Sequence, residues 1–188
     1  MILDYKDVND LNRYKIMSGT VVPRPIAWIV TEDENGILNC APFSYFIPIS
    51  SNPALVLVAI GQKDDGTPKD SLANINETKK ATICFAKKEH AELVQKCATP
   101  LDKGQSEIEE FEIEVQNIKE NFPPMIASCE SALFCEYYDT YKIPSKTTPV
   151  ILEVKYQFIE DDKINERNHV NIDNLARCGV KFKALVDL

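Results

Sequence analysis

The order of apolar and polar positions along the chain predicts a mostly β protein. Apolar runs of strand length recur, and each ends at turn-forming residues. Asn35-Gly36 lies between two such runs and is a strong hairpin signal. The predicted strands cover Pro25–Thr31, Asn35–Phe46, Ala54–Gly61, Lys80–Ala86, Ala132–Ile143 and Val150–Glu160.

Two of these strands carry additional information in their pattern. Ala54–Gly61 is apolar on both faces, so we expect a core on one side and a helix or a second subunit on the other. Val150–Glu160 alternates, which predicts one face formed by Leu152, Val154, Tyr156 and Phe158.

Three segments have helical patterns. The first is Asp4–Met17, which places Leu11, Tyr14 and Met17 on one side and ends near Gly19. The second starts with Thr67 as cap and Pro68 in its first position, with Leu72 and Ile75 facing inward. The third is Lys88–Thr99.

The remaining stretches are expected to be less regular. Leu101–Ile118 is acidic and predicts a loop with a short strand, and Asn165–Leu188 is partly irregular. About six strands joined by hairpins or short helices predict an antiparallel barrel. No repeat or linker divides the chain, so we expect a single domain over residues 1–188.

Composition narrows the classes of partner. The net charge of −8 argues against a nucleic-acid binder. The longest apolar stretch is too short to span a bilayer, and the first ten residues do not form a secretory signal, so we expect a cytoplasmic protein with no membrane contact. The six cysteines form no C-x-x-C pair and there are only two histidines, which favours free thiols over a metal site.

The segment "NCAPFS" interrupts an apolar run with an amide, a proline and a hydroxyl. Proline cannot donate to a sheet ladder, so Pro42 marks either a bulge or a sheet edge. Asn39 and Ser44 then lie near backbone N–H groups that are free of strand pairing, and together they suit a polar heterocycle or a phosphate. The alternative is a strand that simply bends at a barrel corner.

Two further elements suit a phosphate. The helix start at Thr67–Ser71 presents free N–H groups with Lys69 and Ser71 beside them, although an ordinary cap with a solvated lysine has the same pattern. Arg24 lies between two prolines that hold its backbone extended, which leaves its guanidinium free for phosphate or, alternatively, exposed at a strand start.

Taken in order, these motifs resemble a known family. "SGTVVPRPIAW", "NCAPFSYF", "KDSLANI" and, near the end, "NLARCGVKF" are similar to the pattern of the flavoredoxin and flavin-reductase-like group of FMN-binding split barrels. The chain departs from that pattern at Ser71, where the family has Thr, at Asn52-Pro53, where it has two prolines, and at Phe182, where it has Tyr.

The resemblance implies a fold, a cofactor and a set of contacts. The fold is a mainly β, six-stranded antiparallel Greek-key split barrel with a few short helices, and the cofactor is FMN. No side chain is expected to be catalytic and no metal is expected. The cofactor-binding residues that the resemblance implies are Arg24, Thr31, Asn39, Cys40, Ala41, Pro42, Ser44, Lys69, Asp70, Ser71 and Arg177.

The resemblance also implies an activity, and three hypotheses stay open. The first is an NAD(P)H-dependent flavin reductase that transfers hydride to the flavin. The second is a flavoredoxin-like electron carrier that exchanges electrons with a redox protein. The third is a split-barrel binding protein without turnover. We expect a homodimer with FMN near the subunit boundary. Cys40 could be redox-active beside the flavin or could fill space.

Overall fold

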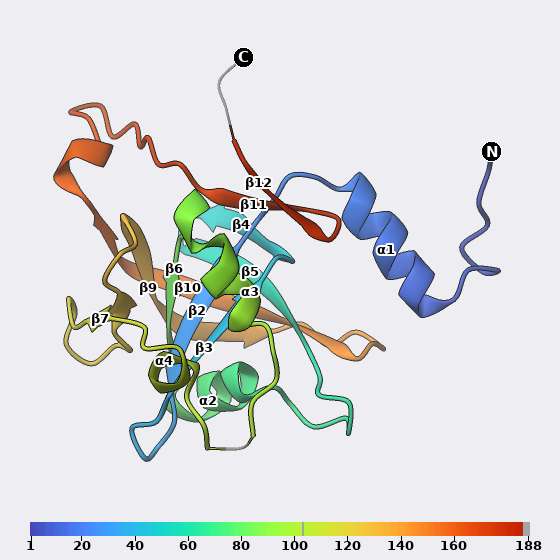
Figure 1. Cartoon of the computed structure of the whole chain (residues 1–188), viewed down its shortest axis with the longest axis horizontal. Helices are drawn as coiled ribbons and strands as arrows, with labels where there is room; N and C mark the ends of the chain where they lie inside the picture. Colours follow the sequence, from blue (N-terminus) through green and yellow to red (C-terminus); the bar gives the residue numbers. More distant parts are fainter. Residues whose placement is uncertain (103, 186–188) are drawn as a thin grey trace.

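The computed structural model describes residues 1–102 and 104–185. Its centre is one antiparallel sheet with the strand order β3-β2-β6-β9-β10-β5-β4 (Figure 1). This arrangement confirms the predicted mainly β, antiparallel architecture. The strands of the sheet are β2 (Ala27–Glu32), β3 (Leu38–Phe43), β4 (Phe46–Ser51), β5 (Ala54–Gly61), β6 (Lys80–Cys84), β9 (Ser131–Thr140) and β10 (Thr147–Ile159).

The sequence predicted about six strands, whereas among the described residues the large sheet has seven and two small sheets add five more. Phe46–Ser51 forms its own strand, β4, which pairs with β5. Pro48 lies in this strand, and the β4–β5 register shifts between Pro48 and Ser50. β4 ends the strand order of the sheet, and proline is tolerated at such an edge because no ladder partner needs its missing N–H.

Two small sheets accompany the large one. β1 (Arg24–Pro25), β11 (Leu175–Cys178) and β12 (Lys181–Ala184) form the first, and β7 (Val115–Gln116) pairs with β8 (Met125–Ile126) in the second. The C-terminal tail, which was predicted to be partly irregular, therefore includes a β-hairpin formed by β11 and β12.

The helices are short. They are α1 (Asp10–Thr20), α2 (Asp70–Thr78), α3 (Ala91–Lys96), which follows a 3-10 turn at Lys88–His90, α4 (Glu107–Glu110) and a second 3-10 turn at Asp161–Lys163. None of the helices in residues 1–102 and 104–185 is both long enough and apolar enough to cross a membrane.

Two of the three predicted helix starts were misplaced, whereas helical structure does begin at Lys88, as a 3-10 turn that leads into α3. α1 begins at Asp10 rather than Asp4, because the Asn9 side chain accepts the Asn12 N–H and caps the helix there. α2 begins at Asp70 with Lys69 at the cap position, and no side chain caps it. The Thr67 hydroxyl instead donates to Asp65 Oδ1 at 2.6 Å.

The core lies on both sides of β2, in which Ala27 to Thr31 are all buried. One cluster contains Ala27 and Ile29 with the apolar face of α2. The other contains Trp28 and Val30 with side chains of α3, α4 and β8. Leu72 and Ile75 of α2 are buried, as predicted.

The predictions for the face patterns of β5 and β10 differ in how well they agree with the structure. In β5 the residues Val56, Val58 and Ile60 are buried, while Leu55 and Leu57 on the other face are half-buried. In β10 the predicted alternation fails beyond Leu152, because the register with β9 shifts between Val154 and Tyr156. Tyr156 is consequently 49% exposed.

Helix α1 projects from the sheet, at the end of the molecule that carries the N-terminus (Figure 1). Its apolar side chains Leu11, Tyr14 and Met17 are exposed, and Ser18 is its buried residue. The expected apolar stripe therefore exists. Its Tyr14 ring stacks on the Tyr45 ring, with 5.9 Å between the ring centroids, while Leu11 and Met17 remain exposed.

Candidate functional site

A groove beside strand β3 consists of two adjoining chambers. The Arg177 chamber has a volume of about 420 Å³ and the Glu107 chamber a volume of about 260 Å³. Tyr14, Ser44, Tyr45, Gln95, Arg177 and Phe182 help to line the first, and Asn39, Ala41, Asp70, Ser71, Cys97 and Glu107 help to line the second. The residues shared by both are Pro42, Phe43, Gln62, Lys69 and Ala98.

Strand β3 is an edge of the sheet, which decides between the two interpretations of Pro42. The β2–β3 register is unbroken and pairs Pro42 with Trp28, so no bulge is present. The Cys40 N–H points away from β2 and donates to Glu107 Oε2 at 2.8 Å. Because strand groups alternate with a period of two, Pro42 lies on the same side as Cys40, where it has no N–H to satisfy.

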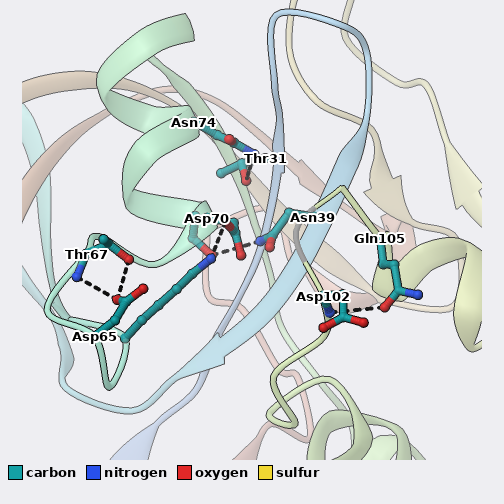
Figure 2. A network of polar contacts seen from close by, with 10 residues as sticks. Thr31, Asn39, Asp65, Thr67, Asp70, Asn74, Asp102 and Gln105 are labelled. Atoms are coloured by element: carbon teal, nitrogen blue, oxygen red, sulfur yellow. Dashed lines mark hydrogen bonds and ion pairs between the residues drawn. The ribbon is translucent and has the colours of Figure 1, made fainter.

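Two buried hydrogen bonds join the β2–β3 hairpin to α2, as Figure 2 shows. Asn39 Nδ2 donates to Ser71 Oγ at 2.8 Å, and Asn74 Nδ2 donates to Thr31 Oγ1 at 3.1 Å. These bonds place the first turn of α2 against the groove. Ser71 Oγ acts as an acceptor in this bond, so its own hydrogen remains a donor for a bound molecule.

The two charged residues at the start of α2 differ in their partners. Asp70 Oδ1 pairs with Lys63 Nζ at 2.7 Å (Figure 2). Lys69 forms no ion pair with any carboxylate of residues 1–102 and 104–185. Its Nζ lies 5.9 Å from the centre of the Phe43 ring, and it borders both chambers. Lys69 is therefore a cation available to an anionic ligand.

Arg24 does not have the free guanidinium that the sequence predicted. The side chain is buried, and its guanidinium donates to the carbonyl oxygens of Ser18 and Gly179. A longer contact joins Nε to Ser44 Oγ at 3.4 Å. The structure places Arg24 behind the groove wall, where it links the end of α1 and the β11–β12 turn to β1.

Thr31 and Cys40 also lie outside the lining of both chambers. Thr31 is fully buried and bonded to Asn74. The Cys40 side chain packs in the core cluster that contains Trp28, and burial raises the pKa of its thiol. Cys40 contributes to the groove wall through its N–H alone, which favours the space-filling interpretation of its side chain.

The other predicted contacts meet at the groove. Asn39, Ala41, Pro42, Ser44, Lys69, Asp70, Ser71 and Arg177 all line at least one chamber. Arg177 Nη1 donates to Gln95 Oε1 at 3.3 Å, and its guanidinium lies 4.2 Å from the centre of the Phe182 ring. Burial lowers the pKa of Arg177, although a guanidinium remains charged.

Sequence reasoning missed several lining residues. Phe43, Tyr45, Gln62, Gln95 and Glu107 were not among the candidates. Phe43 and Tyr45 stand inside the "APFSYF" motif and could have been included from their position. Glu107 lies in the acidic stretch assigned to a loop, and only the buried Ile108 beside it indicates that this stretch packs against the core.

Comparison with known proteins places the chain in a family. The family model described as "Flavin reductase like domain" matches residues 17–172. An uncharacterized protein of Deinococcus radiodurans is 34% identical over 176 residues, which cover 89% of this chain and 77% of that protein.

Solved structures share the fold at lower identity. Nitrilotriacetate monooxygenase component B from Bacillus cereus superposes with a TM-score of 0.91 at 19% identity, covering 100% of this chain and 96% of that one. The 2-nitrobenzoate 2-nitroreductase of Pseudomonas fluorescens superposes with a TM-score of 0.88 at 22% identity, covering 100% and 93%. With most of its length matched by the family model, the chain belongs to the family of flavin reductase like domains.

Proposed function

We propose that this protein binds FMN in the groove beside β3 and transfers hydride from NAD(P)H to the flavin. The observation that carries the proposal is the pair of adjoining chambers with common wall residues. Pockets for small molecules have volumes of roughly 300–1,000 Å³, so the two chambers together suffice for one flavin that spans them, with part of a second molecule beside it. A reductase needs both molecules in contact.

The residues present fit a flavin mononucleotide. Lys69 supplies a cation without a carboxylate partner, and Ser71 supplies a hydroxyl donor on the same turn of α2, so these two would hold the phosphate. Asn39, Ala41, Pro42 and Ser44 would contact the rest of the cofactor. The short extent of this phosphate site favours FMN over FAD.

The protein's own contribution is binding and orientation. A bound flavin supplies the hydride-accepting ring, so no side chain is needed as general acid or base. Lys69 and Arg177 are the charged side chains lining the Arg177 chamber, and no carboxylate of the described residues lines it. A chamber with this charge suits the phosphates of a nucleotide.

The alternative is a flavoredoxin-like carrier that exchanges electrons with a protein partner. Anaerobic mixing of the FMN-loaded protein with NADH or NADPH separates the two. We expect the visible absorbance band of the flavin to bleach rapidly, because hydride transfer reduces the ring. Bleaching that occurs only when a separate reductase is added would refute the reductase proposal and favour the carrier.

We also propose that the protein forms a homodimer. Leu11 and Met17 of α1 and Ile47 and Ile49 of β4 are all exposed, and β4 continues the half-covered outer face of β5. Large exposed apolar patches are rare on monomers, and a two-fold interface is the commonest way to cover apolar surface. Tyr14 of α1 also lines the Arg177 chamber, which brings the same helix to the cofactor groove.

A further inference from the structure

Glu107 is a buried carboxyl to which the proposed function gives no role. It is 7% exposed and stands at the start of α4, where its Oε2 accepts the Cys40 N–H. It forms no ion pair with any lysine or arginine in the described part of the chain. A buried carboxylate without a cation is costly, so such a group favours its neutral form.

The charged and titratable groups around Glu107 do not reverse its preference for the neutral form. Burial is the largest influence and raises the pKa of Glu107, and Asp70 raises it further. The N–H groups of Cys40 and Glu107 lower that pKa, as does Lys63, whose ammonium is already paired with Asp70. The groups that line the same chamber are Lys63, Asp64, Lys69, Asp70 and Cys97, and Cys40 packs behind it.

The position of Glu107 matters because its chamber is also the candidate phosphate site. Lys69 and Ser71, which would hold the phosphate, line this chamber together with Glu107. A phosphate that enters the chamber brings negative charge toward a carboxyl that has little water to screen it. Two negative charges in the same small chamber repel each other, and a proton on the carboxyl removes that repulsion.

We propose that the Glu107 carboxyl takes up a proton from solvent when the phosphate of the flavin binds. The inference rests on the proposed FMN site. Protonated Glu107 adds an O–H donor to the chamber, whereas its ionised form opposes the phosphate. One buried carboxyl thereby makes cofactor binding depend on pH.

The direction in which FMN affinity changes with pH follows from the linkage between FMN binding and proton binding. The phosphate raises the pKa of Glu107 in the complex above its value in the free protein. FMN binding is therefore tightest below the free-protein pKa and weakens as the pH rises through the pKa of the complex. At an effective dielectric constant of about 20, two unit charges within roughly 12 Å of each other interact strongly enough to change a dissociation constant about tenfold or more.

The test measures dissociation constants for FMN and riboflavin by flavin fluorescence, from about pH 5 to pH 8 at low ionic strength. Glu107→Gln keeps an oxygen acceptor for the Cys40 N–H and removes the charge. Glu110→Gln removes the same charge from an exposed position of α4 and is the matched control. The phosphate of free FMN also titrates, near pH 6, and this contribution of the free ligand is the same for all three proteins.

We expect wild type and Glu110→Gln to lose about tenfold more FMN affinity over this range than Glu107→Gln. Riboflavin, which lacks the phosphate, should show no such difference. Calorimetry of the wild type in buffers of different ionisation enthalpy should show more proton uptake with FMN than the phosphate accounts for, and this readout needs no variant.

The possible outcomes separate the two proposals. Identical pH profiles for wild type and Glu107→Gln would overturn the role of Glu107 while leaving the FMN site intact. An equal effect of Glu107→Gln on riboflavin would mean that Glu107 acts on another part of the flavin, and would also overturn it. If neither flavin binds at any pH, the proposed function itself fails.

Discussion

Arg24 offers the sharpest test of how the groove wall is held. The sequence favoured a phosphate contact, but the structure uses the guanidinium to join three segments. Its N–H groups reach the carbonyl oxygens of Ser18 at the end of α1 and Gly179 in the β11–β12 turn. We therefore expect Arg24→Met to destabilise the fold and to leave the recognition of phosphate unchanged.

The magnitude follows from the two carbonyl contacts. A hydrogen bond from a charged donor contributes about 1.5–3 kcal/mol, so two contribute about 3–6 kcal/mol. The contacts to Val21 and Ser44, both at 3.4 Å, are too long to add much. The residues next to the two carbonyls, Gly19 and Val180, are exposed, so water can replace part of the lost contacts and we expect a loss of about 3–4 kcal/mol. Arg24→Lys keeps one donor and should lose about half as much.

Urea unfolding of both variants measures the stability, and flavin fluorescence measures the ratio of the FMN and riboflavin dissociation constants. At about 2–4 °C per kcal/mol for a chain of this size, Arg24→Met should lower the melting temperature by roughly 6–16 °C. The affinity ratio should equal that of the wild type. A variant with wild-type stability that loses its preference for FMN would refute the structural role and restore the phosphate contact.

Three further results are expected. Lys69→Ala should weaken FMN binding by about 1.5–3 kcal/mol while leaving the melting temperature of the apo-protein nearly unchanged, and an unaltered dissociation constant would make Lys69 an ordinary solvated cap. Asn39→Ala and Ser71→Ala, combined in a double-mutant cycle of urea unfolding, should show a coupling of about 1 kcal/mol, whereas additive effects would mean that their buried hydrogen bond contributes nothing. Light scattering of the FMN-loaded protein should give twice the mass of one chain and the combined change Leu11→Glu and Met17→Glu should halve it, while a monomeric wild type would contradict the proposed dimer.

Local signals in the sequence predicted local structure well. The strand Ala54–Gly61 has the predicted bounds, and the hairpin around Asn35-Gly36 is present, with Gly36 at a φ of 83°. These predictions rest on neighbouring residues alone, because a positive φ at a glycine and an apolar run of strand length need no distant partner.

Features that depend on distant residues were not predictable in this way. The guanidinium of Arg24 is held by Gly179, 155 positions along the chain. No pattern around Arg24 contains that information, so a buried structural arginine and a ligand-binding arginine look identical in sequence. The break in β10 at Tyr156 likewise comes from its register with β9 and not from its own alternation.

The residues of the candidate site show the same difference between features that a local motif predicts and features that it does not. Asn39, Ser44, Lys69 and Ser71 were found because their side chains lie on the motif-bearing segments that face the groove. Cys40 lies beside Asn39 on β3, and Thr31 lies on the neighbouring strand β2, but both side chains are fully buried. Glu107 was missed because it reaches the groove from a segment that carries no recognisable motif.

The edge position of β3 explains why a proline stands in the middle of the site. An exposed edge strand presents free N–H groups that can pair with another chain, and proteins suppress this with covering groups or proline. Here Glu107 caps the Cys40 N–H, and Pro42 has no N–H to cap. The edge next to Phe43 can therefore stay open to a ligand without inviting strand pairing. Replacing the proline with a strand-forming residue such as valine would satisfy the apolar pattern and would restore the unpaired donor that the groove avoids.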